Sequence, residues 1–373
     1  MSKLCDCVEI LDSKRIPLSE KQRRNKNKIY PYYGAQGIID YVDDYIFDGE
    51  YVLVAEDGNN LKSLKENIAI WVQGKFWVNN HAHILGKKKG YNLKYIYYTL
   101  NFLDLRRYVT GSAQPKLNQN NLANIEINIP DESIQNKIAG VLGAIDDKIR
   151  INKIISVELE EMAKTIYDYW FLQFEFPNED GKPYKSSDGK MVWSEELKRE
   201  IPEGWEAGFF SDLIEIGNGK DHKDLKDGKI PVYGSGGVMR MVDTYIYNGE
   251  SVLIPRKGTL NNILYVNGAF WTVDTMFYSK MKKKHSALYT YYSAKLFDFE
   301  KLNTGTGVPS MTSSIIYNLK IVIPPDKILE RFDNYVQTFY KQIHEKEREN
   351  RELVLLRDFL LPLLMNGQVG FKS

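Results

Sequence analysis

The chain has 373 residues, of which 43% are hydrophobic and 27% are charged, and its formal net charge is +1. These are ordinary globular values, and they exclude a disordered or fibrous chain. Because domains commonly hold roughly 100 to 200 residues, the length predicts two or three folded units. The net charge neither requires nor excludes a polyanionic partner, since a basic face can lie opposite an acidic one.

The ends of the chain and its cysteines bear on the compartment. Cys5 and Cys7 are the only cysteines, so the sequence has neither a disulfide framework nor a second pair of metal ligands, and we expect structural roles for both. Residues 2–12 lack the apolar stretch of a secretory signal. The C-terminal leucines are interrupted by Arg357 and Pro362, so no apolar run approaches the roughly 18 residues that span a bilayer. We therefore expect a cytoplasmic protein.

The first distinctive segment, residues 21–28, is basic, free of acids and interleaved with amides. DNA binding needs cations for phosphates and planar amide or guanidinium groups for base edges. The segment is thus a candidate DNA contact, with a solvated surface as the plain alternative. Its cations are Lys21, Arg23, Arg24, Lys26 and Lys28.

Residues 1–130 have the pattern of a mixed α/β domain. Short β-branched and aromatic runs such as residues 51–54 are separated by glycine turns, which predicts strands. A helical period follows at residues 92–105. In the turn after the Val-Leu strand, Glu56 and Asp57 can accept hydrogen bonds from cytosine, and Asn59 is a further candidate contact.

A glycine-rich turn near residue 110 leads into a polar segment that contains Gln114, Lys116 and Asn118. These side chains suit phosphates or bases. The alternative, that they cap the next segment, is equally compatible with their positions.

A long helix is predicted at residues 131–175, where apolar residues recur every three or four positions. At 1.5 Å per residue, a helix of roughly 40 residues is ~60 Å long. Residues 176–205, rich in glycine, proline, serine and charge, predict a linker with anchoring aromatics. The narrow stripe of this helix contains Ile138, Leu142, Ile145, Ile149, Asn152 and Leu159.

The remainder of the chain repeats the first part. The string YGAQG from Tyr33 returns as YGSGG from Tyr233, 200 residues later, and GKFW from Gly74 returns as GAFW from Gly268, 194 residues later. The copies agree in order, spacing and residue type, with one shorter loop between these two matches. The repeat predicts a second mixed α/β domain at residues 206–324.

The loops of the second copy carry different charges. Its segment before the core strands holds Lys220 and Lys223 among aspartates, and its turn has Arg256 and Lys257 where the first copy has two acids. An arginine can pair with guanine. This divergence fits two domains that recognise different sequences. Ser310 and Thr312 occupy the second polar segment.

The second long helix is predicted at residues 325–373. Each helix alone would leave its stripe half exposed, so we expect the two helices to pair antiparallel in a coiled-coil-like spacer. Asn152 and Asn350 interrupt the stripes, and a polar seam residue commonly fixes register; simple exposure is the alternative. The second stripe contains Phe332, Val336, Phe339, Ile343, Asn350 and Leu353.

Catalytic motifs are missing from the sequence. The chain has no [ND]PP[YF] tetrapeptide for a flipped base, no glycine-rich cofactor loop and no P-loop. Three Asp-Gly-Lys triplets, at Asp180, Asp188 and Asp227, resemble part of a nuclease site but are more typical of tight turns. His81 and His83 have no histidine equivalents in the second copy, so we expect no metal site there.

The sequence is open to three functional interpretations. A DNA-recognition subunit fits the cationic and amide-rich loops. A helical scaffold with two protein- or glycan-binding domains is the alternative, and it predicts no salt dependence of binding. A self-sufficient methyltransferase or nuclease would need motifs that the sequence lacks.

Over its whole length the chain resembles the specificity subunit of type I restriction-modification systems. The resemblance rests on two similar domains, each followed by a long helix, and on the strings FPNEDGKPYKSSDGKMVW and NRELVLLRDFLLPLLMNGQV. The resemblance implies an α+β fold with two target-recognition domains separated by two antiparallel helices. It also implies recognition of a split duplex DNA target and no active site or cofactor on this chain. The implied partners are two methyltransferase subunits, which use S-adenosylmethionine to methylate adenine N6, and restriction subunits that need ATP and magnesium.

Overall fold

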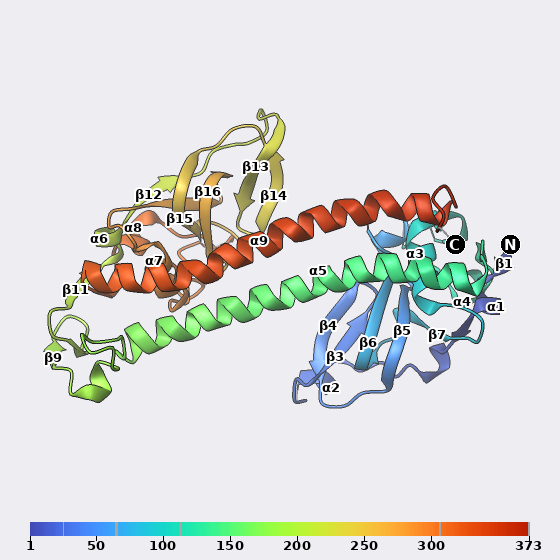
Figure 1. The fold of residues 1–373 in the computed structure, drawn as a ribbon, viewed down its shortest axis with the longest axis horizontal. Helices are drawn as coiled ribbons and strands as arrows, with labels where there is room; N and C mark the ends of the chain where they lie inside the picture. Colours follow the sequence, from blue (N-terminus) through green and yellow to red (C-terminus); the bar gives the residue numbers. More distant parts are fainter. Residues whose placement is uncertain (25, 64–65, 112–113, 306, 372–373) are drawn as a thin grey trace. The chain divides into compact units, whose positions relative to one another are not determined.

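The computed structural model describes residues 1–24, 26–63, 66–111, 114–305 and 307–371. Its contacts divide the chain into two compact units: unit 1 is Met1–Asn152 with Glu347–Ser373, and unit 2 is Lys153–Lys346. Each unit contains one predicted recognition domain and one part of each long helix (Figure 1). Ser112, Ala113 and Thr306, which belong to the predicted glycine-rich turns, lie outside the described residues.

Unit 1 is built on a six-stranded sheet with the order β2-β7-β5-β6-β3-β4. Strand β3 runs parallel to β6, and the other neighbours are antiparallel. The separate pair β1-β8 joins the start of the domain to its end. The elements are β1 (Ser2–Lys3), α1 (Leu4–Cys7), β2 (Val8–Ile10), α2 (Glu20–Arg24), β3 (Tyr30–Gly34), β4 (Gly37–Val42), β5 (Phe47–Ala55), β6 (Ala69–Val78), β7 (Ala82–Lys87), α3 (Leu93–Phe102), α4 (Gln119–Ala123) and β8 (Glu126–Ile127).

Unit 2 repeats this topology, with the sheet order β12-β17-β15-β16-β13-β14 and the separate pair β11-β18. A hairpin, β9-β10, precedes it and has no equivalent among the described residues of unit 1. The elements are β9 (Met191–Ser194), β10 (Arg199–Pro202), β11 (Glu206–Phe209), α6 (Phe210–Leu213), β12 (Ile214–Asn218), β13 (Asp227–Gly234), β14 (Gly237–Val242), β15 (Tyr247–Pro255), β16 (Leu264–Thr272), β17 (Met276–Met281), α7 (Ala287–Lys295), α8 (Ser313–Tyr317) and β18 (Lys320–Ile323).

The central hairpin of each sheet bends at a pair of glycines. Gly49 of β5 lies opposite Gly74 of β6, and both have positive φ, 132° and 86°. Gly249 and Gly268 form the same pair in unit 2, with φ of 143° and 124°. A side chain is strained at such φ values, so the repeated glycine in GKFW and GAFW has a conformational reason.

The long helices are α5 (Glu132–Tyr167) and α9 (Asp326–Met365). In unit 1 the first part of α5 packs against the last part of α9, and in unit 2 the last part of α5 packs against the first part of α9. Ion pairs Asp146–Arg357 and Lys148–Glu349 show that the packing is antiparallel in unit 1. The paired helices predicted from the sequence are thus present.

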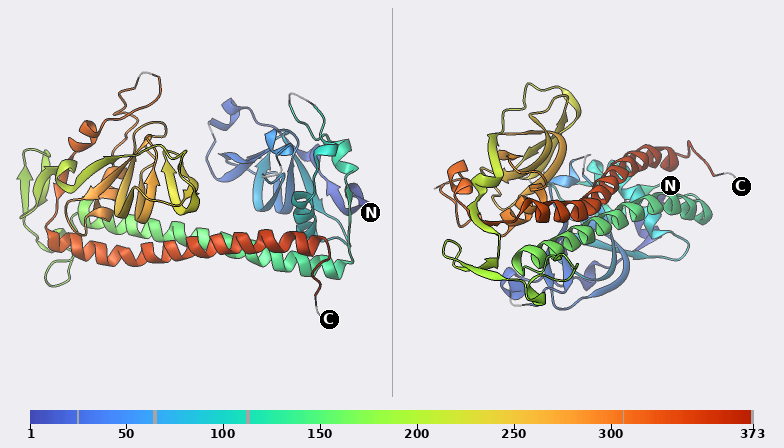
Figure 2. Two further views of the ribbon diagram at one scale, coloured as in Figure 1. Left: turned by 90° about the horizontal axis from the view of Figure 1, so that it is seen from above. Right: turned by 60° about the vertical axis from the view of Figure 1, so that its left-hand side comes forward.

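In each unit the sheet lies on one side of the long-helix segments (Figure 2). Helix α3 packs on β5 and β6, and Tyr98 from α3 reaches Asp146 of α5. The core of unit 1 joins Ile96 of α3 and Leu142 of α5 to Leu364 of α9. Both long helices therefore belong to the folded core as well as to the spacer.

The predicted linker is an ordered part of unit 2. Phe176 stacks on Trp205 with ring centroids 4.9 Å apart, and both rings are buried. Among the Asp-Gly-Lys triplets, Gly181 and Asp188 have positive φ in turns, as predicted. The turn prediction is wrong at Asp227, which begins the strand β13 beside a register shift.

Candidate nucleic-acid interface

In unit 1, four connecting segments meet in what we call loop edge 1: residues 34–37, 56–59, 79–81 and 114–118. Backbone hydrogen bonds hold them together. The amide of Asn79 donates to the carbonyl of Tyr33 at 3.0 Å, and that of Glu56 donates to His81 at 2.9 Å. The amide of Leu117 donates to the carbonyl of Glu56 at 2.8 Å.

Unit 2 has the same frame in loop edge 2, which is formed by residues 234–237, 256–259, 273–275 and 308–312. The equivalent backbone bonds run from Val273 to Tyr233 at 3.0 Å and from Arg256 to Thr275 at 2.8 Å. A third runs from Met311 to Arg256 at 2.8 Å. The two edges therefore have the same pattern of backbone hydrogen bonds but carry different side chains.

Ten of the predicted DNA-binding residues come together at these edges, although they are far apart in sequence. Those of loop edge 1 are Glu56, Asp57, Asn59, Gln114, Lys116 and Asn118, and those of loop edge 2 are Arg256, Lys257, Ser310 and Thr312.

The predicted basic segment is largely neutralised within unit 1. Arg23 and Lys28 both bind Asp40, at 3.0 and 2.7 Å, and Lys26 pairs with Asp43. The hydrogen bond from Lys28, then the backbone amide of Tyr41 and Arg23, lower the pKa of Asp40 to about 2. The cationic field is therefore weaker than the segment alone indicates.

The two remaining cations of this segment lie on the short helix α2. Arg24 forms an exposed ion pair with Glu20 at 2.6 Å. Lys21 is exposed and makes no ion pair with any residue that the structure describes. Lys21 is thus the cation of this segment that is most available to a phosphate.

Beneath loop edge 1 lies a buried charge network centred on His83. Its Nδ1 lies 2.6 Å from Asp12, and its Nε2 lies 2.7 Å from the carbonyl oxygen of Leu117. The ring therefore links Asp12 to the backbone of Leu117. Burial alone would raise the pKa of Asp12, but His83, the amide of Ile84 and Arg15 together lower it.

Glu56 joins the same network rather than facing solvent freely. Its carboxylate lies 2.7 Å from Arg15 and 3.2 Å from Lys116. Burial acts to raise the pKa of Glu56, yet Arg15, His83 and Lys116 lower it overall. The carboxylate therefore positions Lys116, whose side chain is 54% exposed.

Unit 2 replaces this network with an apolar support. Phe277 stands at the position of His83, and the guanidinium of Arg256 lies 5.8 Å from the centre of its ring. No ion pair of Arg256 occurs within the part of the chain that the structure describes. A guanidinium held on an aromatic ring and without a carboxylate keeps its donors available for a ligand.

Two predicted contacts cap helices. The side chain of Asn118 accepts from the amide of Asn121 at 2.8 Å, and that of Thr312 accepts from the amide of Ile315 at 3.4 Å. The capping alternative thus accounts for both. Asp57 binds His81 at 2.6 Å.

The other predicted residues of unit 2 lie on its surface. Lys220, Lys223 and Lys257 are exposed, and Ser310 is half-buried. Lys223 lies 3.9 Å from Asp221, whereas the indole of Trp271 donates to the carbonyl of Lys220 at 2.9 Å.

The helix pair places its polar residues opposite each other. In unit 1 the amide of Asn152 donates to Asn350 and to Glu349, both at 2.9 Å. The other predicted seam residues are buried or half-buried. The buried ones are Ile138, Leu142, Ile145 and Ile149 in unit 1 and Phe332, Val336 and Ile343 in unit 2. The half-buried ones are Leu353 in unit 1 and Leu159 and Phe339 in unit 2.

The sequence reasoning missed Asp146, which links α3 to both long helices. It accepts from Tyr98 at 2.6 Å and from Arg357 at 3.0 Å. The sequence offered two signals for this contact. One is an acid directly after the seam residue Ile145, and the other is Arg357 inside the apolar stripe of α9.

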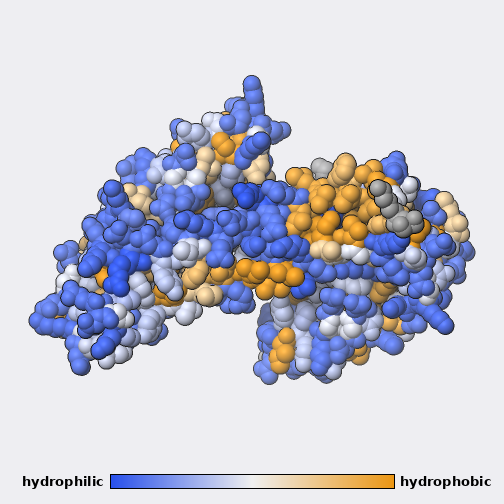
Figure 3. Space-filling model, in the orientation of Figure 1, coloured by the Kyte–Doolittle hydropathy of each residue, from blue (hydrophilic) through white to orange (hydrophobic). Residues whose placement is uncertain are grey.

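The last part of α9 carries an exposed apolar surface within unit 1, visible as the orange area over that part of the helix in Figure 3. Leu355 is 71% exposed, Leu356 46% and Phe359 65%. Exposed apolar groups gathered on one helix mark a surface for a partner.

The comparisons with known proteins agree with this architecture. The family described as the type I restriction modification DNA specificity domain matches residues 1–161 and 202–353. The MjaIX specificity subunit of Methanocaldococcus jannaschii is 25% identical over 371 residues, covering 86% of this chain and 84% of that protein. A putative type I specificity subunit of Haemophilus influenzae is 37% identical over 142 residues, covering 38% of this chain and 36% of that protein.

A solved type I S subunit from M. genitalium superposes with a TM-score of 0.61 at 16% identity, covering 100% of this chain and 96% of that one. The fold and the two matched segments define a DNA specificity protein. The chain belongs to the type I restriction-modification specificity subunit family, whose members recognise a DNA target and are not enzymes.

Two further findings concern features expected from the sequence. Cys7 is buried, and burial raises the pKa of its thiol, which suits a packing role. Among the helices of the described residues, none is sufficiently long and apolar to cross a membrane.

Proposed function

We propose that each unit recognises one half of a bipartite duplex DNA target. The observation that carries this proposal is the pair of loop edges, which share three equivalent backbone hydrogen bonds but present different side chains. A common frame with different donors and acceptors suits two readers of different base sequences.

In this proposal, loop edge 1 reads through Lys116, Gln114 and Asn59, with Lys21 contacting a phosphate. Loop edge 2 recognises bases with Arg256. The nearby lysines Lys257, Lys220 and Lys223 contact the phosphates of the DNA. Arg256 is half-buried over Phe277, and an arginine side chain is well suited to the O6 and N7 atoms of guanine. Exposed lysines suit phosphates, where orientation matters less.

The long helices would set the gap between the two half-sites. Helix α5 has 36 residues and α9 has 40. At 1.5 Å per residue these are lengths of roughly 54 and 60 Å. Equivalent positions on duplex DNA recur on one face about every 34 Å, so a spacer of fixed length would select the separation of the half-sites.

The helices would also dock the partners. Methyltransferase subunits, two per chain, would bind S-adenosylmethionine and methylate adenine N6, and restriction subunits would use ATP and magnesium, all in the cytoplasm. The apolar surface formed by Leu355, Leu356 and Phe359 supports docking on α9, since a surface of this kind is expected to be covered by protein.

A genome-wide map of N6-methyladenine, made with and without this gene, tests the proposal. We expect one bipartite motif to disappear on deletion. Exchange of residues 1–130 for those of a relative should change only one half of the motif. An unchanged map in cells with an active cognate methyltransferase would contradict the proposal.

A further inference from the structure

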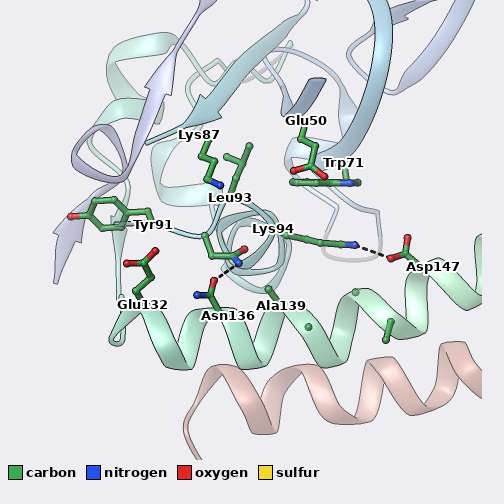
Figure 4. Close-up of a pocket in the computed structure, with 14 residues that line it drawn as sticks. Glu50, Trp71, Lys87, Tyr91, Leu93, Lys94, Glu132, Asn136, Ala139 and Asp147 are labelled. Atoms are coloured by element: carbon green, nitrogen blue, oxygen red, sulfur yellow. Dashed lines mark hydrogen bonds and ion pairs between the residues drawn. The ribbon is translucent and has the colours of Figure 1, made fainter. Parts of the chain in front are cut away.

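Unit 1 contains a pocket of about 440 Å³ between its sheet, the start of α3 and the helix α5. Glu50 and Trp71 approach it from the sheet, and Asn136 approaches it from α5 (Figure 4). Lys94 closes one side through its ion pair with Asp147 at 3.4 Å. The volume falls within the range of sites that bind a ligand or a partner's side chain.

Unit 2 fills the equivalent space with its own side chain. Gln337 of α9 occupies the position of Gly143, 194 residues later, and its side-chain nitrogen lies 2.7 Å from Glu250 and 3.0 Å from the hydroxyl of Tyr265. Glu250 and Tyr265 are the counterparts of Glu50 and Trp71 in the repeat. The pocket therefore exists in unit 1 because a glycine replaces a glutamine.

Two glycines of α5, Gly140 and Gly143, line this pocket in the interior of a long helix. Glycine is an unfavourable residue there compared with almost any other except proline. A Cβ atom at Gly140 would have nothing within 4 Å, whereas one at Gly143 would lie 2.9 Å from the side-chain nitrogen of Lys94, which would have to shift. Packing within the chain accordingly gives no reason for Gly140, whereas Gly143 leaves room for Lys94.

A second difference between the units concerns the aromatic residue of this space. The indole N–H of Trp71 is buried and has no hydrogen-bond partner among the described residues. Its counterpart Tyr265 donates to Glu250 at 2.6 Å. The side chain at this position is therefore linked to the glutamate by a hydrogen bond in unit 2 and not in unit 1.

We propose that this pocket receives a glutamine or asparagine side chain from the methyltransferase subunit that docks on unit 1. Its amide N–H would donate to the carboxylate of Glu50, as Gln337 donates to Glu250 at 2.7 Å, in addition to the bond that Glu50 accepts from Gln73 at 3.0 Å. Gln337 provides the same group within unit 2. This proposal rests on the proposed function, and it makes the two methyltransferase sites of the chain unequal.

The test is titration of the full chain with its cognate methyltransferase subunit, followed by calorimetry and native mass spectrometry. The wild-type chain should show two sites whose affinities differ by about tenfold, the contribution of one or two hydrogen bonds. Gly143→Gln fills the pocket and should weaken the tighter site by that factor, so that the sites become alike. Gly140→Gln should do the same, and it is the safer variant because its Cβ meets no atom.

The melting temperature separates binding from folding. Both variants replace a helical glycine and should leave it unchanged or raise it by about 2 to 4 °C. Lys137→Gln is the matched control, because it adds the same side chain to an exposed position of α5 outside the pocket, and it should bind as the wild type does.

Equal affinities in the wild type, or unchanged binding by both glycine variants, would overturn the pocket proposal alone. An equal loss in Lys137→Gln would also overturn it. Failure of the wild-type chain to bind any methyltransferase subunit would instead refute the proposed function, and the pocket proposal with it.

Discussion

Asn152 of α5 and Asn350 of α9 are hydrogen-bonded to each other at 2.9 Å within the packed helix pair of unit 1. Each interrupts an apolar stripe, and a polar pair at such a position fixes the register of two helices. The arrangement favours one alignment of the helices at some cost in stability.

Asn152→Ala should destabilise unit 1 by about 1 to 3 kcal/mol, because it leaves the Asn350 side chain without this partner. Urea unfolding of the full chain measures the change. The double variant Asn152→Leu with Asn350→Leu is the control, and it should recover the stability because neither asparagine remains and Glu349 keeps its ion pair with Lys148. A single variant as stable as the wild type would show that the pair contributes nothing.

His83→Phe introduces into unit 1 the residue that unit 2 has at this position. It removes the ring that contacts both Asp12 and the Leu117 carbonyl in the buried network, so it should cost about 3 to 5 kcal/mol. Urea unfolding again provides the measurement, with His81→Ala as the control. Because the side chain of His81 is 51% exposed, its replacement should change stability by less than about 0.5 kcal/mol.

Acid should destabilise unit 1 through its paired carboxyls. Asp12, Asp40 and Glu56 all have folded pKa values below their ordinary ones, and that of Asp40 is about 2. Their contribution is therefore complete above the unfolded value of about 4 and is lost as the pH falls toward the folded value. Urea midpoints between about pH 5 and pH 2 measure it. Asp40→Asn should flatten part of this dependence, and an identical profile would argue against the ion pairs.

Arg256→Ala should alter recognition of one half-site. If Arg256 pairs with guanine, the substitution should cost about 1 to 3 kcal/mol at the specific site and relax the preference at one base. Lys223→Ala is the comparison, since loss of a phosphate contact should weaken all sequences alike. Methylation maps of strains with each variant distinguish the two results. Relaxed preference in the other half of the motif would exclude this assignment.

Phe359→Ser should weaken association with the methyltransferase subunit by about tenfold or more, because it removes an aromatic group from the apolar surface of α9. The ring is 65% exposed, so folding should be unaffected. Calorimetric titration measures the affinity, and circular dichroism verifies the fold. Glu352→Gln, an exposed change on the same helix, is the control; equal affinities for all three chains would remove α9 as a docking surface.

Much of the fold was predictable because the repeat provides an internal comparison. The match of Tyr33 with Tyr233 and of Gly74 with Gly268 predicted two domains of one topology, and both sheets have the same strand order. The periodic stripes predicted both long helices, and antiparallel packing follows from their need to bury one face. The prediction of a turn at Asp227 is wrong because a β-bulge accepts the same residue types as a tight turn.

The candidate site was harder to predict, because pairing depends on partners that are distant in sequence. The basic segment contains no acid of its own, yet Asp40 and Asp43 return to it from β4 and the residue after it. His83 lies 71 residues from Asp12, and neither spacing nor composition indicates their contact. The sequence identified the loops that meet at each edge. Which of their charged side chains are neutralised by ion pairs, and which remain available to a ligand, could be seen only in the structure.

Leu364, nine residues from the end of the chain, is buried in the core of unit 1 beside side chains from α3 and the start of α5. During synthesis, residues 1–152 leave the ribosome first. Their apolar surface therefore becomes fully buried only after the end of α9 has also been synthesised. Unit 2, whose parts are contiguous in the chain, has no such delay. A premature stop codon after residue 346 would accordingly harm the first recognition domain and spare the second, contrary to the order in which they are encoded.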